Sequence, residues 1–101
     1  MNYLYQGDLP NNFEFTNSIA VDTETMGLKH QRDRLCLVQL SNGDGNAHLI
    51  QLGSDFGYKA ENLKALMKNK KIIKIFHYAR FDLGMIKKYL GIMPINVYST
   101  K

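Results

Sequence analysis

The period of the hydrophobic pattern changes near residue 58, and this change restricts the fold more than any other feature. Apolar residues alternate in three short runs, residues 18–24, 34–41 and 46–52, which predict three β-strands. The sequence NGDG separates the second and third runs, and its glycines accept the positive φ of a hairpin turn. Over residues 58–70 the spacing becomes helical. The first three strands are therefore expected to form an antiparallel meander.

Two helices, a fourth strand and the start of a fifth are expected after the meander. Ala60, Leu63, Leu66 and Met67 recur at helical intervals and predict a helix over residues 58–70. Residues 71–76 predict a strand, residues 79–91 predict a second helix that ends at Gly91, and residues 95–101 are expected to begin a fifth strand. This order predicts an α/β fold in which helices flank a mixed sheet, with a parallel strand added to the meander.

Composition narrows the class of protein. A chain of 101 residues with 45% hydrophobic and 22% charged residues is expected to form a single folded domain. No apolar segment reaches the ~20 residues that cross a bilayer, and the N-terminus has no signal-like pattern, so a cytoplasmic protein without a membrane partner is predicted. Cys36, the one cysteine, is expected in the core. The net charge of +4 is compatible with a nucleic-acid partner.

Asp22 and Glu24 are the first candidate site residues. They lie two apart in a predicted strand, so their side chains share a face at a spacing of roughly 7 Å. Their mutual repulsion opposes ionisation, and a hard divalent ion such as Mg²⁺ or Mn²⁺ removes that penalty. The alternative is that these acids pair with the nearby basic residues Lys29, Arg32 and Arg34.

Asp82 is the third candidate. It lies in the first turn of the second predicted helix, where an acid is also explained by the helix dipole. In a mixed sheet, however, the first strand and the parallel strand before this helix are natural neighbours. Their carboxyl ends would bring Asp22, Glu24 and Asp82 to one crevice. Three acids there could hold two divalent ions about 4 Å apart, as phosphodiester hydrolysis requires.

The same residues resemble two sequence motifs of a known family. VDTETMGL followed by DRLCLVQLS resembles the first exonuclease motif of the DEDD 3′-5′ exonucleases, and KIFHYARFDLGMI resembles the second. The span from Ile19 to Ile92 is similar to ribonuclease D and its relatives, which share the ribonuclease H-like fold. The resemblance implies a 3′-5′ exonuclease that acts on RNA by a two-metal-ion mechanism, with Asp22, Glu24 and Asp82 as catalytic metal ligands.

The resemblance also implies substrate-binding positions. Residues that follow the Glu of the first motif line the pocket for the terminal nucleotide, with an apolar residue against the base. His77 and Phe81 flank the second motif's Asp, and Phe81 is also expected in the core. The resemblance assigns no substrate-binding role to Tyr78. Arg80 is expected at the surface. The substrate-binding residues implied by the resemblance are Thr25, Met26, Gly27, Leu28, His77 and Phe81.

One part of the family pattern has no counterpart. The third motif carries a fourth metal-binding Asp and, four residues earlier, a Tyr that orients the attacking water. No acid follows Asp82, and neither Tyr89 nor Tyr98 has an Asp four residues later. Residues 1–101 are therefore expected to be the N-terminal part of a single exonuclease domain whose C-terminal part is missing. We expect such a fragment to be inactive unless a complementing chain is present, and to self-associate through its uncovered sheet.

Three alternatives to an exoribonuclease stay open from the sequence. A DNA-directed 3′-5′ exonuclease of the same family would use the same acids, and no residue must read a 2′-hydroxyl. A non-catalytic ribonuclease H-like remnant would bind nucleic acid without turnover. A purely structural α/β domain would pair its acids with Lys and Arg.

Overall fold

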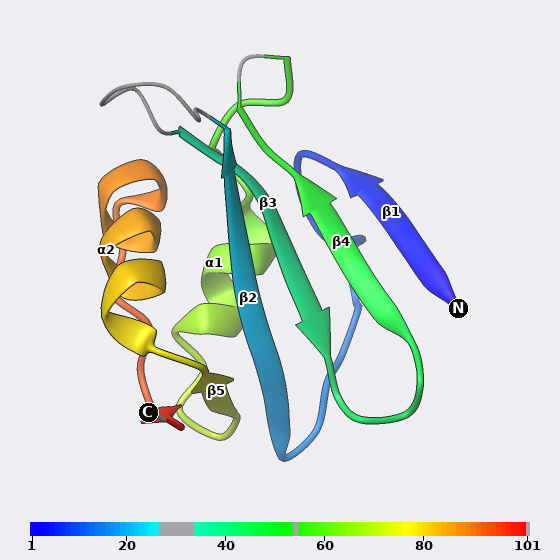
Figure 1. Ribbon diagram of the computed structural model, residues 1–101. Coiled ribbons are helices and arrows are strands. Elements are labelled where there is room, and N and C mark those ends of the chain that lie inside the picture. The colour runs from blue at the N-terminus through cyan, green and yellow to red at the C-terminus, as the bar shows by residue number, and fades with distance from the viewer. Residues whose placement is uncertain (27–33, 54, 101) are drawn as a thin grey trace.

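The computed structural model describes residues 1–26, 34–53 and 55–100. Within these ranges the chain forms a mixed sheet and two helices (Figure 1). The elements are β1 (Asn2–Gln6), β2 (Ser18–Met26), β3 (Arg34–Ser41), β4 (Ala47–Gln51), α1 (Glu61–Met67), β5 (Ile73–Phe76), α2 (Ala79–Leu90) and β6 (Val97–Ser99).

The sheet confirms the predicted topology and extends it by one strand. Its order is β1-β4-β3-β2-β5-β6. β2 pairs antiparallel with β3, and β3 pairs antiparallel with β4, which is the predicted meander. β5 lies parallel to β2, and the short β6 lies parallel to β5. The first strand of the meander is thus a central strand of the sheet.

β1 was not predicted from the sequence. It pairs parallel with β4, and the Tyr5 hydroxyl and His48 Nδ1 lie 3.0 Å apart in a hydrogen bond. The ring of Tyr3 stacks on His48, and Phe13 meets the same imidazole edge-on at 4.8 Å. The alternation of Tyr3 and Tyr5 is a strand signal, but the partner that makes it a strand is more than forty residues away.

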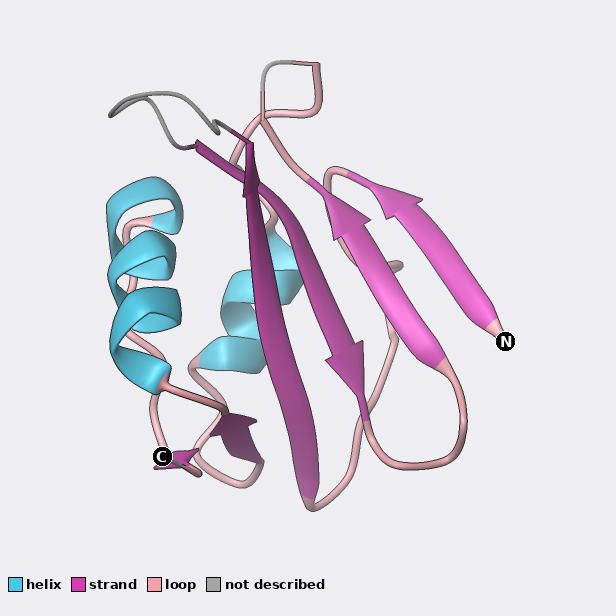
Figure 2. Cartoon of the chain, viewed as in Figure 1, coloured by secondary structure: helices cyan, strands magenta, loops and turns pink. Residues whose placement is uncertain are grey.

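The hydrophobic core lies between the helices and one face of the sheet. Ile19 and Val21 of β2 are buried there with Leu63 of α1 and Ile86 of α2, so both helices cover the same face. Figure 2 shows the helical layer behind and beside the strands. No helix among the described residues is long and apolar enough to cross a membrane. The cytoplasmic location stays a prediction.

Helix α1 is shorter than the predicted 58–70. Ala60 precedes it in the left-handed conformation (φ 31°, ψ 57°) and provides no capping side chain. Asp8 supplies the cap instead: its carboxylate accepts the backbone N–H groups of Asn62 and Leu63, both at 2.8 Å. Helix α2 begins and ends where the sequence predicts, and Gly91 (φ 73°) closes it.

A buried lysine holds the turn between α1 and β5. Lys74 is fully buried, and its Nζ donates hydrogen bonds to the carbonyls of Asn69, Ile72 and Ile95. Burial lowers the pKa of Lys74. Because these carbonyls satisfy the ammonium, the side chain joins this turn to the segment that leads into β6.

We expect Asp8→Ala to lower the free energy of unfolding by about 1–2 kcal/mol, because two N-terminal amides of α1 lose their acceptor. Urea unfolding followed by circular dichroism measures the change. Asp55→Ala is the matched control, since Asp55 is exposed and caps no helix. Equal stability of the Asp8→Ala variant and the wild type would contradict the capping role.

Candidate functional site

β2 presents two carboxylates on the face that the helices do not cover. Asp22 and Glu24 are both exposed and lie opposite Gln39 and Leu37 of β3. The pairing register shifts directly after Glu24. The intervening Thr23 points to the helical side and is buried, so the predicted sharing of one face by Asp22 and Glu24 is what the strand shows.

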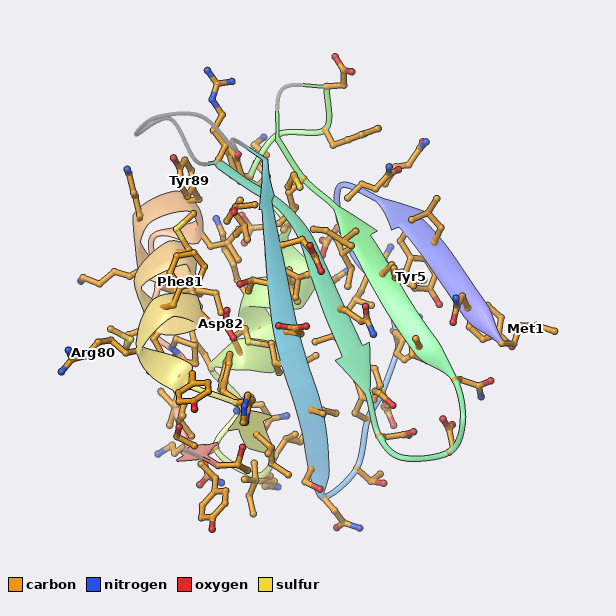
Figure 3. All side chains as sticks on the ribbon, in the orientation of Figure 1. Met1, Tyr5, Arg80, Phe81, Asp82 and Tyr89 are labelled. Carbon is orange, nitrogen blue, oxygen red and sulfur yellow. The ribbon has the colours of Figure 1, made fainter. Side chains whose placement is uncertain are left out.

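Asp82 approaches β2 from the helical side. It lies in the first turn of α2 and is only 6% exposed, and the Thr23 hydroxyl donates a hydrogen bond to its carboxylate. Figure 3 shows Asp82 between α2 and β2, whereas Arg80 points away from the sheet, as predicted. Burial raises the pKa of Asp82, the Thr23 hydrogen bond opposes this shift, and the negative charge of Asp22 adds to it.

The structure brings these acids to one strand without gathering them into one cluster. Among the described residues, no three His, Cys, Asp or Glu side chains are grouped so as to hold a metal ion. Nor do Asp22, Glu24 and Asp82 form an ion pair with a described basic residue such as Arg34. Lys29 and Arg32, the other predicted partners, lie outside the described residues.

The donor chemistry of this strand fits a hard divalent cation. Two exposed carboxylates without a basic partner among the described residues supply the oxygen ligands that Mg²⁺ and Mn²⁺ prefer. The hydrogen bond from Thr23 places the third acid, Asp82, beside the residue that separates Asp22 from Glu24. A nearby cation would favour the ionised form of Asp82, which burial disfavours.

A cavity of about 320 Å³ adjoins Asp22 on the uncovered side of the sheet. Its lining residues come from β2, β3 and the end of β5. His77 and Thr100 also line it, and His77 Nδ1 lies 3.0 Å from Thr100 Oγ1. Gln39 and Thr100 were not predicted as site residues. Nothing in the local sequence distinguishes them, because only the sheet pairing places them beside Asp22.

The other candidates of the second motif are exposed. His77 is exposed, and its ring meets that of Tyr78 edge-on at 4.4 Å. The expectation that Phe81 is in the core is wrong: Phe81 is 53% exposed, because α2 buries Asp82, Met85 and Ile86 instead. Cys36, also predicted in the core, is only partly buried.

The residues that follow Glu24 are only partly described. Thr25 is half-buried, and Met26 is the last residue of β2. Gly27 and Leu28 lie outside the described residues. Their substrate-binding roles, like those of His77 and Phe81, stay predictions.

Comparison with known proteins gives one consistent family. The family described as 3′-5′ exonuclease matches residues 8–101. Ribonuclease D of Bartonella henselae is 32% identical over 83 residues, which are 82% of this chain and 20% of that protein. β1 precedes the part of the chain that the family matches.

Solved structures agree with this family. Brucella melitensis NrnC bound to pGG is 45% identical to this chain and has a TM-score of 0.85. The match covers 99% of this chain and 49% of the NrnC chain. The structure of NrnC with bound Mg²⁺ has the same identity and TM-score. Escherichia coli RNase D, an exoribonuclease involved in structured RNA processing, is 27% identical with a TM-score of 0.70 over 84% of this chain and 22% of that chain. The ribonuclease H-like fold is thereby confirmed, and this chain spans about half the length of the NrnC chains and about a fifth of that of the ribonuclease D proteins.

We expect Asp82→Asn to be more stable than the wild type at pH 7. The pKa of Asp82 in the folded state is raised above its value of about 3.9 in the unfolded state. Protonation of Asp82 therefore contributes stability below a pH of about 3.9, and this contribution is lost as pH rises through the folded-state pKa. The amide stays neutral throughout and can still accept from Thr23. The difference in unfolding free energy should therefore shrink as pH falls, which urea titrations across acid and neutral pH would measure. A less stable variant at pH 7 would contradict this explanation.

Proposed function

Because the chain belongs to the 3′-5′ exonuclease family of hydrolases, we propose that it acts in the removal of nucleotides from the 3′ ends of RNA. One observation carries the proposal. Asp22 and Glu24 stand on the uncovered face of a central strand, beside a cavity, and Asp82 reaches the same strand at Thr23.

Asp22, Glu24 and Asp82 would hold Mg²⁺ or Mn²⁺, with two ions in a complete site. The Mg²⁺ bound to NrnC, at 45% identity, supports this assignment. When bound, such ions lower the pKa of water and stabilise the leaving oxygen of a phosphodiester. The chain's own contribution is to orient the acids: pairing on both sides fixes β2, and the Thr23 hydroxyl fixes the Asp82 carboxyl.

RNA is the proposed substrate class. NrnC has been solved with pGG, and RNase D is named as an exoribonuclease involved in structured RNA processing, so the named relatives favour RNA. The cavity beside Asp22 offers hydrogen-bonding groups of Gln39, Ser41 and Thr100 to a nucleotide. A DNA-directed exonuclease is the alternative, and its test is cleavage of matched RNA and DNA oligonucleotides.

We further propose that residues 1–101 supply part of the catalytic domain. Asp82 is the last acid of the sequence, so a water-orienting residue and a fourth carboxylate would have to come from outside residues 1–101. Loss of general-base assistance alone typically lowers a rate by 10²–10⁴-fold. This proposal and the metal site are independent, because Asp22 and Glu24 do not need the missing group to bind a cation.

We expect Asp22→Asn to weaken Mg²⁺ or Mn²⁺ binding at least tenfold, since the substitution removes a charged ligand from the pair. Isothermal titration calorimetry measures both affinities. Asp44→Asn is the matched control: it removes the same charge from the exposed hairpin between β3 and β4. Equal affinities of wild type and Asp22→Asn would leave a non-catalytic nucleic-acid-binding role as the better explanation.

We expect the 101-residue chain alone to release mononucleotides from an RNA 3′ end at a very low rate. Gel analysis of a 5′-labelled RNA with Mg²⁺ present measures the rate. Robust release that Asp22→Asn abolishes would show that no complementing chain is needed.

A further inference from the structure

The charges of this chain are distributed unevenly along it. After residue 58 there are ten basic and two acidic residues, whereas the first 58 residues contain three basic and seven acidic ones. The second segment contains both helices. The excess of positive charge is therefore associated with the helical layer, while Asp22 and Glu24 belong to the opposite face of the sheet.

The turn after α1 concentrates this charge. Lys68, Lys70 and Lys71 are exposed, and no described carboxylate forms an ion pair with them. Lys68, the C-cap residue, offsets the negative end of the helix dipole, but Lys70 and Lys71 lie beyond the helix, which ends at Met67. The dipole does not explain the last two lysines.

The turn is held in one conformation. The buried Lys74 ammonium donates to the carbonyls of Asn69 and Ile72, on either side of Lys70 and Lys71. The Asn69 side chain accepts the Lys71 N–H at 2.9 Å, and Asn96 donates to the Lys70 carbonyl at 3.1 Å. Lys70 and Lys71 are thus presented on a fixed backbone, which lowers the entropy lost when a ligand binds.

A cavity of about 640 Å³ adjoins the same turn. It lies between the segment of residues 9–17 and α1, and Lys71 and Asn69 form part of its wall. Phe13 contributes an aromatic surface that Phe15 and His48 hold in place, with ring centroids 4.9 and 4.8 Å away. This cavity shares no lining residue with the one beside Asp22.

The walls of this cavity are rich in amides. Its lining residues include asparagines at positions 12, 17, 62 and 69, and Glu14 is the one carboxylate among them. The amides of Asn62 and Asn69 already form hydrogen bonds within the protein. The amides of Asn12 and Asn17 have no hydrogen-bond partner among the described residues. Amides form hydrogen bonds with base edges, an aromatic ring stacks on a base, and lysines contact phosphates. These are the groups with which proteins bind single-stranded nucleic acid.

We propose that this groove, formed by residues 9–17, α1 and the Lys68–Lys71 turn, is an accessory site for single-stranded nucleic acid. The proposal rests on the proposed exonuclease function and deepens it: the groove holds the body of a longer strand, at a surface separate from the acids that act on its end.

The test compares two pairs of adjacent exposed lysines. Lys70→Gln/Lys71→Gln changes the turn, and Lys87→Gln/Lys88→Gln changes the end of α2 by the same net charge. Fluorescence anisotropy with labelled oligouridylate of about 12 nucleotides, a typical site size for such proteins, measures binding. EDTA is present, so the result depends neither on cleavage nor on the metal site.

We expect the turn variant to bind roughly 10- to 30-fold more weakly at about 0.1 M salt, with a salt slope lower by about 1.4, because two phosphate contacts are lost. The control variant should bind nearly as the wild type does. Equal weakening of both variants, or no weakening of the turn variant, would overturn the proposal, as would absence of binding by the wild type. Circular dichroism confirms that each variant is folded.

Metal binding separates this proposal from the proposed function. The turn variant should bind Mg²⁺ in calorimetry as tightly as the wild type does, because neither Lys70 nor Lys71 lines the cavity at Asp22. Weaker Mg²⁺ binding by the turn variant would show that its substitutions disturb the site at Asp22, and would overturn the accessory site.

Discussion

The alternation of side chains along β2 is the constraint on which both the packing and the candidate site depend. Ile19 and Val21 are buried against the helices, so Asp22 and Glu24 must point to the opposite face. β3 and β5 pair with β2 on either side and fix its register. A slip by one residue would bury both carboxylates and expose the apolar side chains, at a large cost in free energy. Core packing therefore positions Asp22 and Glu24, and no additional interaction is needed to orient them.

The position of the third acid, Asp82, depends on how α2 packs against the sheet. Met85 and Ile86 dock α2 on the sheet, and Asp82 falls on the same buried stripe. A carboxylate within an apolar stripe is unfavourable, and the Thr23 hydroxyl offsets only part of its desolvation. The chain thus keeps a destabilising group at the contact between α2 and β2, as is common where function requires a charge. The proposed metal site would give this burial a reason that stability alone does not provide.

The sheet and the helices present different chemistry to solvent. The uncovered face of the sheet carries carboxylates and a small cavity, whereas the helical side carries lysines and a larger groove lined in part by asparagines. These charges would favour a polyanion at the helical side and a divalent cation at the sheet. Because the two surfaces share no lining residue, substitutions can change one without altering the other.

Local patterns in the sequence determined the meander, the parallel β5, the extent of α2 and the shared face of Asp22 and Glu24, because periodicity and turn residues act within a few positions. The two exonuclease motifs likewise identified the family. The tertiary structure alone decided the rest. β1 needs His48 as its partner, and α1 starts at Glu61 because Asp8, 54 residues before Asn62, caps it. Phe81 is exposed because the docking angle of α2 buries Asp82. Each of these depends on a contact between residues distant in sequence, which no local pattern encodes.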